Sequence, residues 1–366
     1  MNIAIFSPSQ NAYSETFIQV HKNYLKGKVF YYYGKDIINL EKGNKRINIL
    51  KKLIFKLKSI LKNSTSYYSN QILLESLKLN AIDVILVEYG NYAHRTINLF
   101  KKSKLPIVVH FHGYDASVYE EIKRADNYKN VFAYAKKIVV VSRVMEQKLI
   151  SMGCPSDKII YNVYGARPEF YNVNPSLKKN QFLSVGRFVD KKAPYYIILA
   201  FKNIVKHYPE TKLLLAGDGY LKECCENLVR YFNLSNNIKF LGVISAEEYQ
   251  VLLSESLAFV QHSITTSNGD MEGTPLSVLE ASLSGLPVVS TYHAGIQDVI
   301  IHGKTGLLSK EHDVDSMANH LLMLLKDKDL AKELGQNGKQ YINENVNMKK
   351  HIDILQNALE TAFNKQ

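Results

Sequence analysis

Short runs of β-branched and aromatic residues alternate with longer segments of helical periodicity along most of the chain. In the first half the runs are NIAIF (2–6), KVFYYY (28–33), DVILVEY (83–89), PIVVHFH (106–112) and KKIVVVS (136–142). After an aperiodic stretch around 168–179, the pattern resumes with QFLSVGR, TKLLLAGDG, NIKFLG, LAFVQHS and LPVVST. Such alternation is typical of parallel sheets with helical crossovers. It predicts an α/β protein with two doubly wound, Rossmann-like domains.

The length of 366 residues also fits two domains. We expect an N-terminal domain over 1–172, a C-terminal domain over 180–346, and a helix over 347–366. That helix either packs back on the first domain or is an ordinary terminal helix. Ligands bind beyond the carboxyl ends of the strands in such sheets, so the two domains should face a ligand-binding cleft.

The net charge of +12 is unevenly distributed. Residues 1–180 carry 28 basic and 13 acidic side chains, whereas residues 181–366 carry 18 and 21. A basic N-terminal half indicates an anionic partner. Phospholipid, nucleic acid and sugar phosphate all remain possible partners at this point.

Three cysteines without a metal-ligand spacing favour a reducing compartment. The start MNIAIFSPS has no signal-peptide pattern, and no apolar run reaches the roughly 18 residues of a spanning helix. We therefore expect a cytoplasmic protein that is not integral to a membrane.

The segment MEGTPLSVLEASLSGLP (271–287) contains a helix start and a helix stop. Thr274 is the expected N-cap, Pro275 the first helical residue and Gly285 the residue after the C-cap. Glu272 precedes this helix and Glu280 lies within it. Two carboxylates near a helix N-terminus suit a ligand with hydroxyls and phosphate, and a capped surface helix is the alternative.

Two cations follow the first strand of the C-terminal domain, in VGRFVDKKAP (185–194). Arg187 offers bidentate donors and Lys192 a compact charge, a pairing suited to a leaving diphosphate. Scattered surface cations are the alternative interpretation.

These motifs occur in one order with LLLAGDGYL, KFLGVISAEE and HGKTGLL, and upstream with SETFI, HFHGYD and VVVSRVMEQKLISMGCPSDKIIYNVYG. The ordered set resembles retaining glycosyltransferases of family four (group 1), especially the bacterial surface-polysaccharide branch. The resemblance spans nearly the whole chain and implies the GT-B fold. It also implies transfer of a sugar from a nucleotide-sugar donor, UDP- or GDP-linked, without a metal or other cofactor.

The resemblance further implies roles for individual residues. Arg187 and Lys192 contact the donor diphosphate, Glu280 the ribose diol, Glu272 the sugar hydroxyls, and His112 faces the transferred sugar. The resemblance implies a front-side attack without a covalent nucleophile. In such an attack the leaving phosphate helps to deprotonate the acceptor hydroxyl. The donor is further expected to contact Gly186, Gly217, Gly219, Leu241, Gly273, Thr274, Pro275 and Leu276. Candidates on the acceptor or sugar side are Ser14, Glu15, Glu88, Tyr89 and Asp115.

Two departures from the family pattern stand out. The N-terminal segment SPSQNAYSETF lacks the glycine pair of many relatives, and Ser14 is a plausible N-cap there. Pro275 replaces a frequent glycine and removes one backbone N–H.

The segment 42–64 contains eight basic and no acidic residues, with leucines and isoleucines at helical spacing. Such a helix fits an anionic membrane surface, with Lys51, Lys52, Lys56 and Lys58 as the contacts. A lipid-linked saccharide acceptor and a peripheral position on the inner face of the cytoplasmic membrane would follow. The alternative is that the apolar stripe packs on the sheet of the first domain. No nucleic-acid motif accompanies the charge.

Asp313 and Asp315 resemble a metal-binding DxD, but their position predicts the start of a helix, where acidic residues suit the helix dipole. We expect no metal site. A sugar-nucleotide epimerase of the same fold, and a non-catalytic glycan- or membrane-binding subunit, are the remaining alternatives to a transferase in capsule, exopolysaccharide or lipopolysaccharide O-antigen synthesis.

Overall fold

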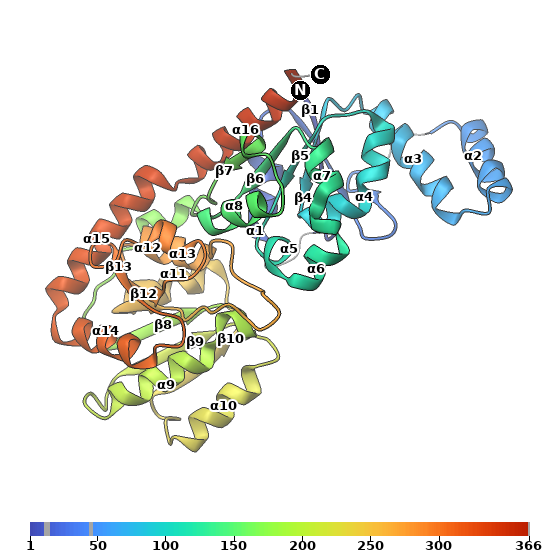
Figure 1. Cartoon of the computed structure of the whole chain (residues 1–366). Coiled ribbons are helices and arrows are strands. Elements are labelled where there is room, and N and C mark those ends of the chain that lie inside the picture. The colour runs from blue at the N-terminus through green and yellow to red at the C-terminus, as the bar shows by residue number, and fades with distance from the viewer. Residues whose placement is uncertain (11–14, 44–46, 365–366) are drawn as a thin grey trace. The chain divides into compact units, whose positions relative to one another are not determined.

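A computed structural model describes residues 1–10, 15–43 and 47–364, which divide into two compact units (Figure 1). The first unit comprises Met1–Val141, Met145–Asn162 and Ile352–Gln366. The second comprises Ser142–Val144 and Val163–His351. Residues 163–172, assigned by the sequence to the N-terminal domain, thus belong to the second unit.

The sheet of the first unit has seven strands in the order β3-β2-β1-β4-β5-β6-β7. All neighbours pair in parallel except β2 and β3. The five runs predicted in this half are all confirmed as strands, whereas the short β3 and β7 were not predicted. The bounds are β1 Asn2–Ser7, β2 Lys28–Tyr33, β3 Asn39–Leu40, β4 Val84–Glu88, β5 Ile107–His110, β6 Lys137–Val140 and β7 Ile159–Tyr161.

The sheet of the second unit has six strands in the order β10-β9-β8-β11-β12-β13, all parallel. The five predicted runs are again strands, and β13 forms from the end of the HGKTGLL motif. The bounds are β8 Gln181–Val185, β9 Lys212–Ala216, β10 Ile238–Gly242, β11 Ala258–Val260, β12 Val288–Thr291 and β13 Gly306–Ser309.

Strand order reverses beside β1 in the first sheet and beside β8 in the second. At such a switch point the connections leave toward opposite faces, which opens a crevice at the carboxyl ends of the two strands. Each unit therefore has one preferred ligand position, beyond β1 and β4 or beyond β8 and β11.

Helices connect the strands of both units. In the second unit α9 packs against both α10 and α14, whereas α12 packs against α15. The first unit contains α1 Thr16–Tyr24, α2 Ile49–Leu61, α3 Thr65–Leu79, α4 Gly90–Ser103, α5 Tyr114–Ser117, α6 Tyr119–Arg124, α7 Lys129–Tyr134 and most of α8 Arg143–Ser151. The second contains α9 Pro194–Val205, α10 Lys222–Tyr231, α11 Ala246–Glu255, α12 Leu276–Leu283, α13 Ile296–Val299, α14 Val314–Lys326 and α15 Lys328–Asn345.

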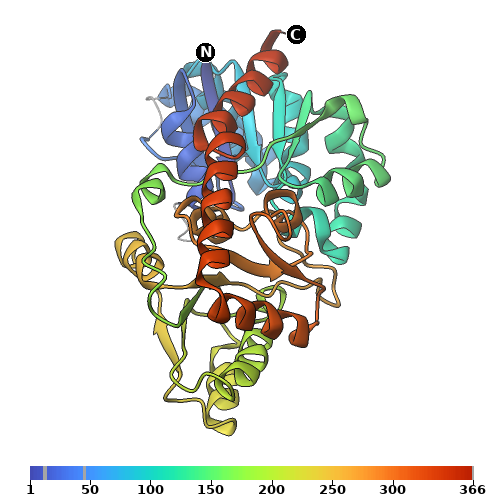
Figure 2. The same cartoon turned by 90° about the vertical axis from the view of Figure 1, so that its left-hand side faces the viewer.

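The last helix, α16 (Met348–Asn364), begins in the second unit and has most of its length in the first. Figure 2 shows its final turns beside the N-terminal segment of the chain. There the backbone N–H of Lys26 donates to Oε1 of Gln356 at 3.0 Å, and Lys26 pairs with Asp353 at 3.4 Å.

Aromatic side chains fill much of each core. Phe6 stacks on Tyr32 with ring centroids 4.8 Å apart and meets the edge of Phe100 at 5.1 Å. In the second unit Phe182 and Phe201 are fully buried and meet edge to face. These cores hold the strand ends at fixed positions.

Helix α12 starts one residue later than the sequence predicts. Pro275, with extended backbone, is the N-cap, and Thr274 lies in the preceding loop. Gly285, with φ +82°, follows the C-cap as predicted. The Asp313 side chain caps α14 by accepting from the N–H of Ser316, which confirms the helix-start interpretation of this acidic pair.

The turn after β9 requires glycine. Gly217 has φ +130°, and a Cβ there would lie 1.9 Å from the carbonyl oxygen of Gly186. The N–H of Gly186 in turn donates to the carbonyl of Ala216 at 3.0 Å. The turn 217–219 therefore lies directly against the loop that carries Arg187.

We predict that Gly217→Ala destabilises the protein more than Gly303→Ala does. Gly303 also has positive φ but has open space around it, so its substitution costs only the left-handed backbone, about 1–2 kcal/mol. Steric overlap adds about 1–3 kcal/mol at Gly217. Urea denaturation measures both free energies of unfolding, and equal losses would contradict the close approach.

Candidate functional site

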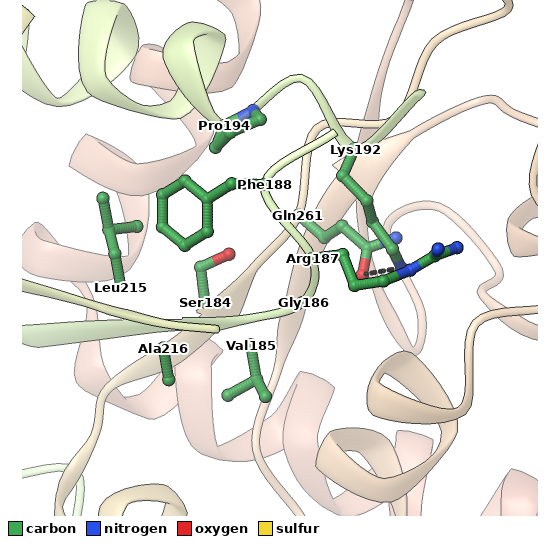
Figure 3. A pocket seen from close by; sticks show the side chains of 10 residues that line it. All are labelled: Ser184, Val185, Gly186, Arg187, Phe188, Lys192, Pro194, Leu215, Ala216 and Gln261. Atoms are coloured by element: carbon green, nitrogen blue, oxygen red, sulfur yellow. Dashed lines mark hydrogen bonds between the residues drawn. The ribbon is translucent and has the colours of Figure 1, made fainter. Parts of the chain in front are cut away.

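A small pocket lies at the switch point of the second unit, beyond β8 and β11. Figure 3 shows its apolar wall and, on another side, Arg187, Lys192 and Gln261. Arg187 is exposed, and its guanidinium makes no hydrogen bond or ion pair with any residue in the described ranges. Its guanidinium is therefore available to an anion.

Lys192 is held just inside this pocket. Its Nζ donates to Oε1 of Gln261 at 3.3 Å and pairs with Oε2 of Glu272 at 3.4 Å. Burial lowers the pKa of Lys192, and the nearby Lys191 and Arg187 act in the same direction, whereas Glu272 opposes the shift. The structure thus brings Lys192 and Glu272 together, with Arg187 close enough to influence both.

Glu272 has one carboxylate oxygen that accepts no hydrogen bond from the described residues. Its side chain is 10% exposed, and Oε1 is buried without a hydrogen-bond partner among the described residues. Burial opposes ionisation, but the positive charges of Lys192 and Lys191 outweigh burial and lower the pKa of Glu272. A charged, buried oxygen without a donor is suited to accept from a ligand hydroxyl.

Neighbouring groups keep the Glu272 loop in place. Lys191 pairs with Asp270 at 3.0 Å and donates to the carbonyl of Met271. The N–H of Glu272 donates to Nε2 of His293 at 3.1 Å, and Nδ1 of His293 lies 2.6 Å from Glu311. Sequence reasoning missed Gln261, His293 and Glu311, although each follows a strand that it did predict or a motif that it quoted.

Glu280 has a different environment from the one expected. It is 5% exposed, and its Oε1 accepts from Nε of Arg167 at 2.6 Å. Burial raises the pKa of Glu280 in spite of this bond. The sequence analysis did not identify Arg167 as a partner, and the contact of Glu280 with a ribose stays a prediction.

The other predicted donor residues lie in the second unit. Gly186 lines the pocket, and Gly219 approaches the carbonyl of Phe188 in the same way as Gly217 approaches Gly186. Leu241 is in β10, and the rest, Gly273, Thr274, Pro275 and Leu276, form the loop and first turn of α12.

A second polar cluster lies at the switch point of the first unit. Glu88, at the end of β4, is completely buried. His21 Nδ1 lies 2.7 Å from its Oε1, and His112 Nε2 lies 2.8 Å from its Oε2. Burial opposes ionisation, but His21 and His112 outweigh it and lower the pKa of Glu88 to about 2.

Two of the acceptor-side candidates are engaged by other groups of the protein. Both oxygens of Glu88 are occupied by histidines, so its carboxylate supports His112 from inside the protein. Asp115 is also fully buried, and it accepts from the backbone N–H groups of Gly90, His112 and Gly113. Asp115 fixes the loop after β5, and its contact with an acceptor stays a prediction.

Glu15 and Tyr89 form a more accessible pair. The Tyr89 hydroxyl donates to Oε1 of Glu15 at 2.9 Å, and the Ser9 hydroxyl donates to Oε2. Burial raises the pKa of Tyr89, and Glu15 adds to this effect. Glu15 is also the N-cap position of α1. Ser14 lies outside the described residues.

The ligand atoms of His21, Glu88 and His110 lie within 4.8 Å of one another. This spacing is compatible with a divalent metal ion. Hydrogen bonds from His21 and His112 account for both carboxylate oxygens, and the absence of a metal requirement stays a prediction.

Helix α2 presents its apolar residues to solvent. Among the described side chains of α2 none is buried, and Leu50, Leu57 and Ile60 are 64%, 61% and 68% exposed. Phe55 and Ser59, on the opposite face, are half-buried. Lys51 pairs with Glu75 of α3, and Figure 1 shows α2 and α3 side by side. The interpretation that this stripe packs on the sheet is wrong.

The sequence matches the family described as glycosyl transferases group 1 over residues 167–341. It is 32% identical over 307 residues to the amylovoran biosynthesis glycosyltransferase AmsK of Erwinia amylovora. This alignment covers 78% of this chain and 75% of AmsK. The chain is a group 1 glycosyltransferase. The putative colanic acid biosynthesis glycosyltransferase WcaL of Salmonella typhimurium is 29% identical over 245 residues, 65% of this chain and 60% of WcaL.

Solved structures show the fold of this group 1 glycosyltransferase. Anabaena Alr3699/HepE in complex with UDP aligns with a TM-score of 0.76 and 16% identity, over 99% of this chain and 100% of HepE. The lipopolysaccharide outer core galactosyltransferase WaaB aligns with a TM-score of 0.69 and 19% identity over the full length of both chains. The predicted GT-B fold is confirmed. None of the helices in the described ranges has the length and hydrophobicity that a bilayer-spanning segment needs.

We predict that Glu88→Gln reduces stability most at neutral pH. The folded pKa of Glu88 is about 2, below the usual value, so its charge stabilises the fold above about pH 4.5 and less as pH falls toward 2. The difference in free energy of unfolding between wild type and variant should therefore shrink between pH 5 and pH 3. Glu120→Gln, an exposed change on α6, is the control, and a pH-independent difference would contradict the charged state of Glu88.

Proposed function

We propose that this glycosyltransferase is a retaining, metal-independent enzyme that transfers a sugar from a nucleotide-sugar to a saccharide acceptor. The observation that supports it best is Glu272, a buried carboxylate with an unpartnered oxygen, held beside Lys192 and the exposed Arg187. One ligand that carries both hydroxyls and a diphosphate would satisfy all three groups.

The proposed chemistry uses each group where charge changes. The bond from the anomeric carbon to the diphosphate oxygen breaks, and the diphosphate keeps the electron pair. Arg187 and Lys192 stabilise the negative charge that develops there. The acceptor oxygen bonds to the anomeric carbon on the same face, and its proton passes to a phosphate oxygen. Glu272 accepts from sugar hydroxyls, which orients the ring.

In the first unit we assign His112 to the transferred sugar. Glu88 orients its ring through Nε2 at 2.8 Å, and the rings of Phe17 and Tyr89 lie 4.5 Å from it. Glu15 and Tyr89 are the acceptor-side groups that keep partial exposure.

The donor is proposed to be UDP- or GDP-linked. The structure of HepE, which has a similar fold, was solved with UDP-glucose. This complex supports a uridine nucleotide as the first donor to test. We predict that one nucleotide among UDP, GDP and dTDP sugars stabilises the protein in a thermal-shift assay with EDTA present. Slow donor hydrolysis should release a sugar of retained configuration.

Arg187→Ala should lower this turnover by about a hundredfold, since it removes a charge-assisted contact to the leaving group. The matched control is Arg230→Ala, an exposed arginine on α10. Unchanged turnover in Arg187→Ala would refute the diphosphate site. Nucleotide binding without any turnover, even with acceptors, would favour a non-catalytic subunit, and epimerised donor would favour an epimerase.

We further propose that the acceptor is lipid-linked and belongs to exopolysaccharide or lipopolysaccharide assembly. AmsK and WcaL are named for amylovoran and colanic acid biosynthesis. Helix α2 supports the lipid: its exposed apolar face is flanked by Lys52, Lys56 and Lys58, which are exposed as well. Apolar residues between cations suit an anionic bilayer surface, and a peripheral position on the inner face of the cytoplasmic membrane follows.

We predict that replacing Lys52, Lys56 and Lys58 with Glu abolishes cosedimentation with vesicles of phosphatidylglycerol and phosphatidylcholine. Lys51 is left unchanged because it pairs with Glu75. Each lysine near the surface contributes about 1 kcal/mol, so reversing three should release the protein.

The control makes the same charge change at Lys101, Lys102 and Lys104, which are exposed at the end of α4. Equal loss of vesicle binding in both variants would show that net charge alone matters. Undiminished binding of the α2 variant would refute the membrane surface.

A further inference from the structure

We propose that His293 and Glu311 are positioning residues that fix the Glu272 loop through one tautomer of His293. This inference rests on the proposed role of Glu272 toward the donor sugar. It concerns a relay that begins at Glu311, passes through the imidazole and ends on the backbone of Glu272.

The hydrogen-bond directions assign the tautomer. The backbone N–H of Glu272 donates to Nε2 of His293 at 3.1 Å, so Nε2 carries no proton. The proton is then on Nδ1, which lies 2.6 Å from Oε1 of Glu311 and donates to it. The His293 side chain is fully buried, which keeps water from replacing either bond.

Glu311 is itself fixed by a second loop. Its Oε2 accepts from the N–H of Thr265 at 2.8 Å, and its Oε1 lies 3.2 Å from the Thr265 hydroxyl. Burial opposes ionisation of Glu311, but the bonds from His293 and Thr265 outweigh it and lower the pKa. The segments that follow β11, β12 and β13 thus meet at this carboxylate.

A backbone contact holds the other side of the same loop. The N–H of Gly295 donates to the carbonyl of Gly273 at 2.9 Å. A Cβ on Gly295 would lie 2.0 Å from Oγ1 of Thr274, so the two segments touch without room for a side chain. The backbone at 272 and 273 is therefore held at two consecutive residues by the turn after β12.

This geometry matters because Glu272 has to place one buried oxygen. Oε1 lacks a partner in the described structure, and Oε2 is occupied by Lys192. A displacement of about 1 Å at such a group can lower a rate by on the order of a hundredfold. Contacts that fix the backbone of Glu272 therefore also fix the position of Oε1, the oxygen proposed to face the ligand.

The decisive variant is Glu311→Gln. In Glu311 one carboxylate oxygen accepts from His293 Nδ1–H and the other from Thr265 N–H. Glutamine has only one acceptor oxygen, and its NH₂ group cannot accept, so one of these two bonds is lost. We expect kcat to fall about ten- to a hundredfold, while the dissociation constant of the free nucleoside diphosphate, which Arg187 and Lys192 contact, changes less than twofold. Glu333→Gln, an exposed Glu on α15, is the matched control.

Two readouts test the relay without activity. Nitrogen-15 NMR of histidine-labelled protein should show His293 protonated at Nδ1 in wild type and altered in Glu311→Gln. Amide exchange at Glu272 should be slow in wild type and at least tenfold faster in the variant.

Substitutions of His293 itself test the relay through activity. His293→Gln, which keeps an acceptor for the Glu272 N–H, should retain more activity than His293→Phe.

Wild-type kcat together with an unchanged tautomer in Glu311→Gln would overturn the proposal. So would a loss of nucleotide affinity equal to the loss of kcat, because it would show general damage to the site. If no donor is turned over by the wild type, the proposed function fails, and the tautomer and exchange data still decide the relay.

Discussion

The buried pair of Lys192 and Glu272 is the interaction on which the site in the second unit depends. Each ion would cost several kcal/mol to bury alone, so each requires the other, and Gln261 and Lys191 complete their surroundings. The two charges come from different strand ends, after β8 and after β11. The loops must therefore hold their positions to a fraction of an ångström, and the His293 contact to the Glu272 backbone does so.

The two clusters differ in how fully their carboxylates are used. In the first unit His21 and His112 occupy both oxygens of Glu88, and three backbone N–H groups surround Asp115. In the second, one oxygen of Glu272 has no donor among the described residues. A saturated carboxylate supports its neighbours, whereas an unsatisfied one is suited to a ligand. This difference separates supporting residues from ligand-facing ones.

The sequence could place the candidate residues at strand ends but could not rank them. Glu88 and Asp115 lie at or just after strand ends, and Glu280 lies in the helix that follows Glu272, yet all three are buried with partners. Their partners His21 and Arg167 lie 67 and 113 residues away along the chain. Burial of a side chain depends on such distant segments, and no local pattern contains that information. Helix α2 shows the opposite difference from expectation: its apolar side chains, which a local pattern would assign to a core, are exposed.

By itself the sequence determined the ten principal strands, the two doubly wound units and the family, because hydrophobic periodicity and ordered motifs are local properties. It also predicted the residue types of the proposed diphosphate and sugar site. Which carboxylate keeps an open oxygen, which arginine stays exposed and which histidine tautomer holds the loop depend on the folded chain. Those properties arise when parallel strands bring their carboxyl ends to one edge, where groups far apart in the chain determine each other's solvation.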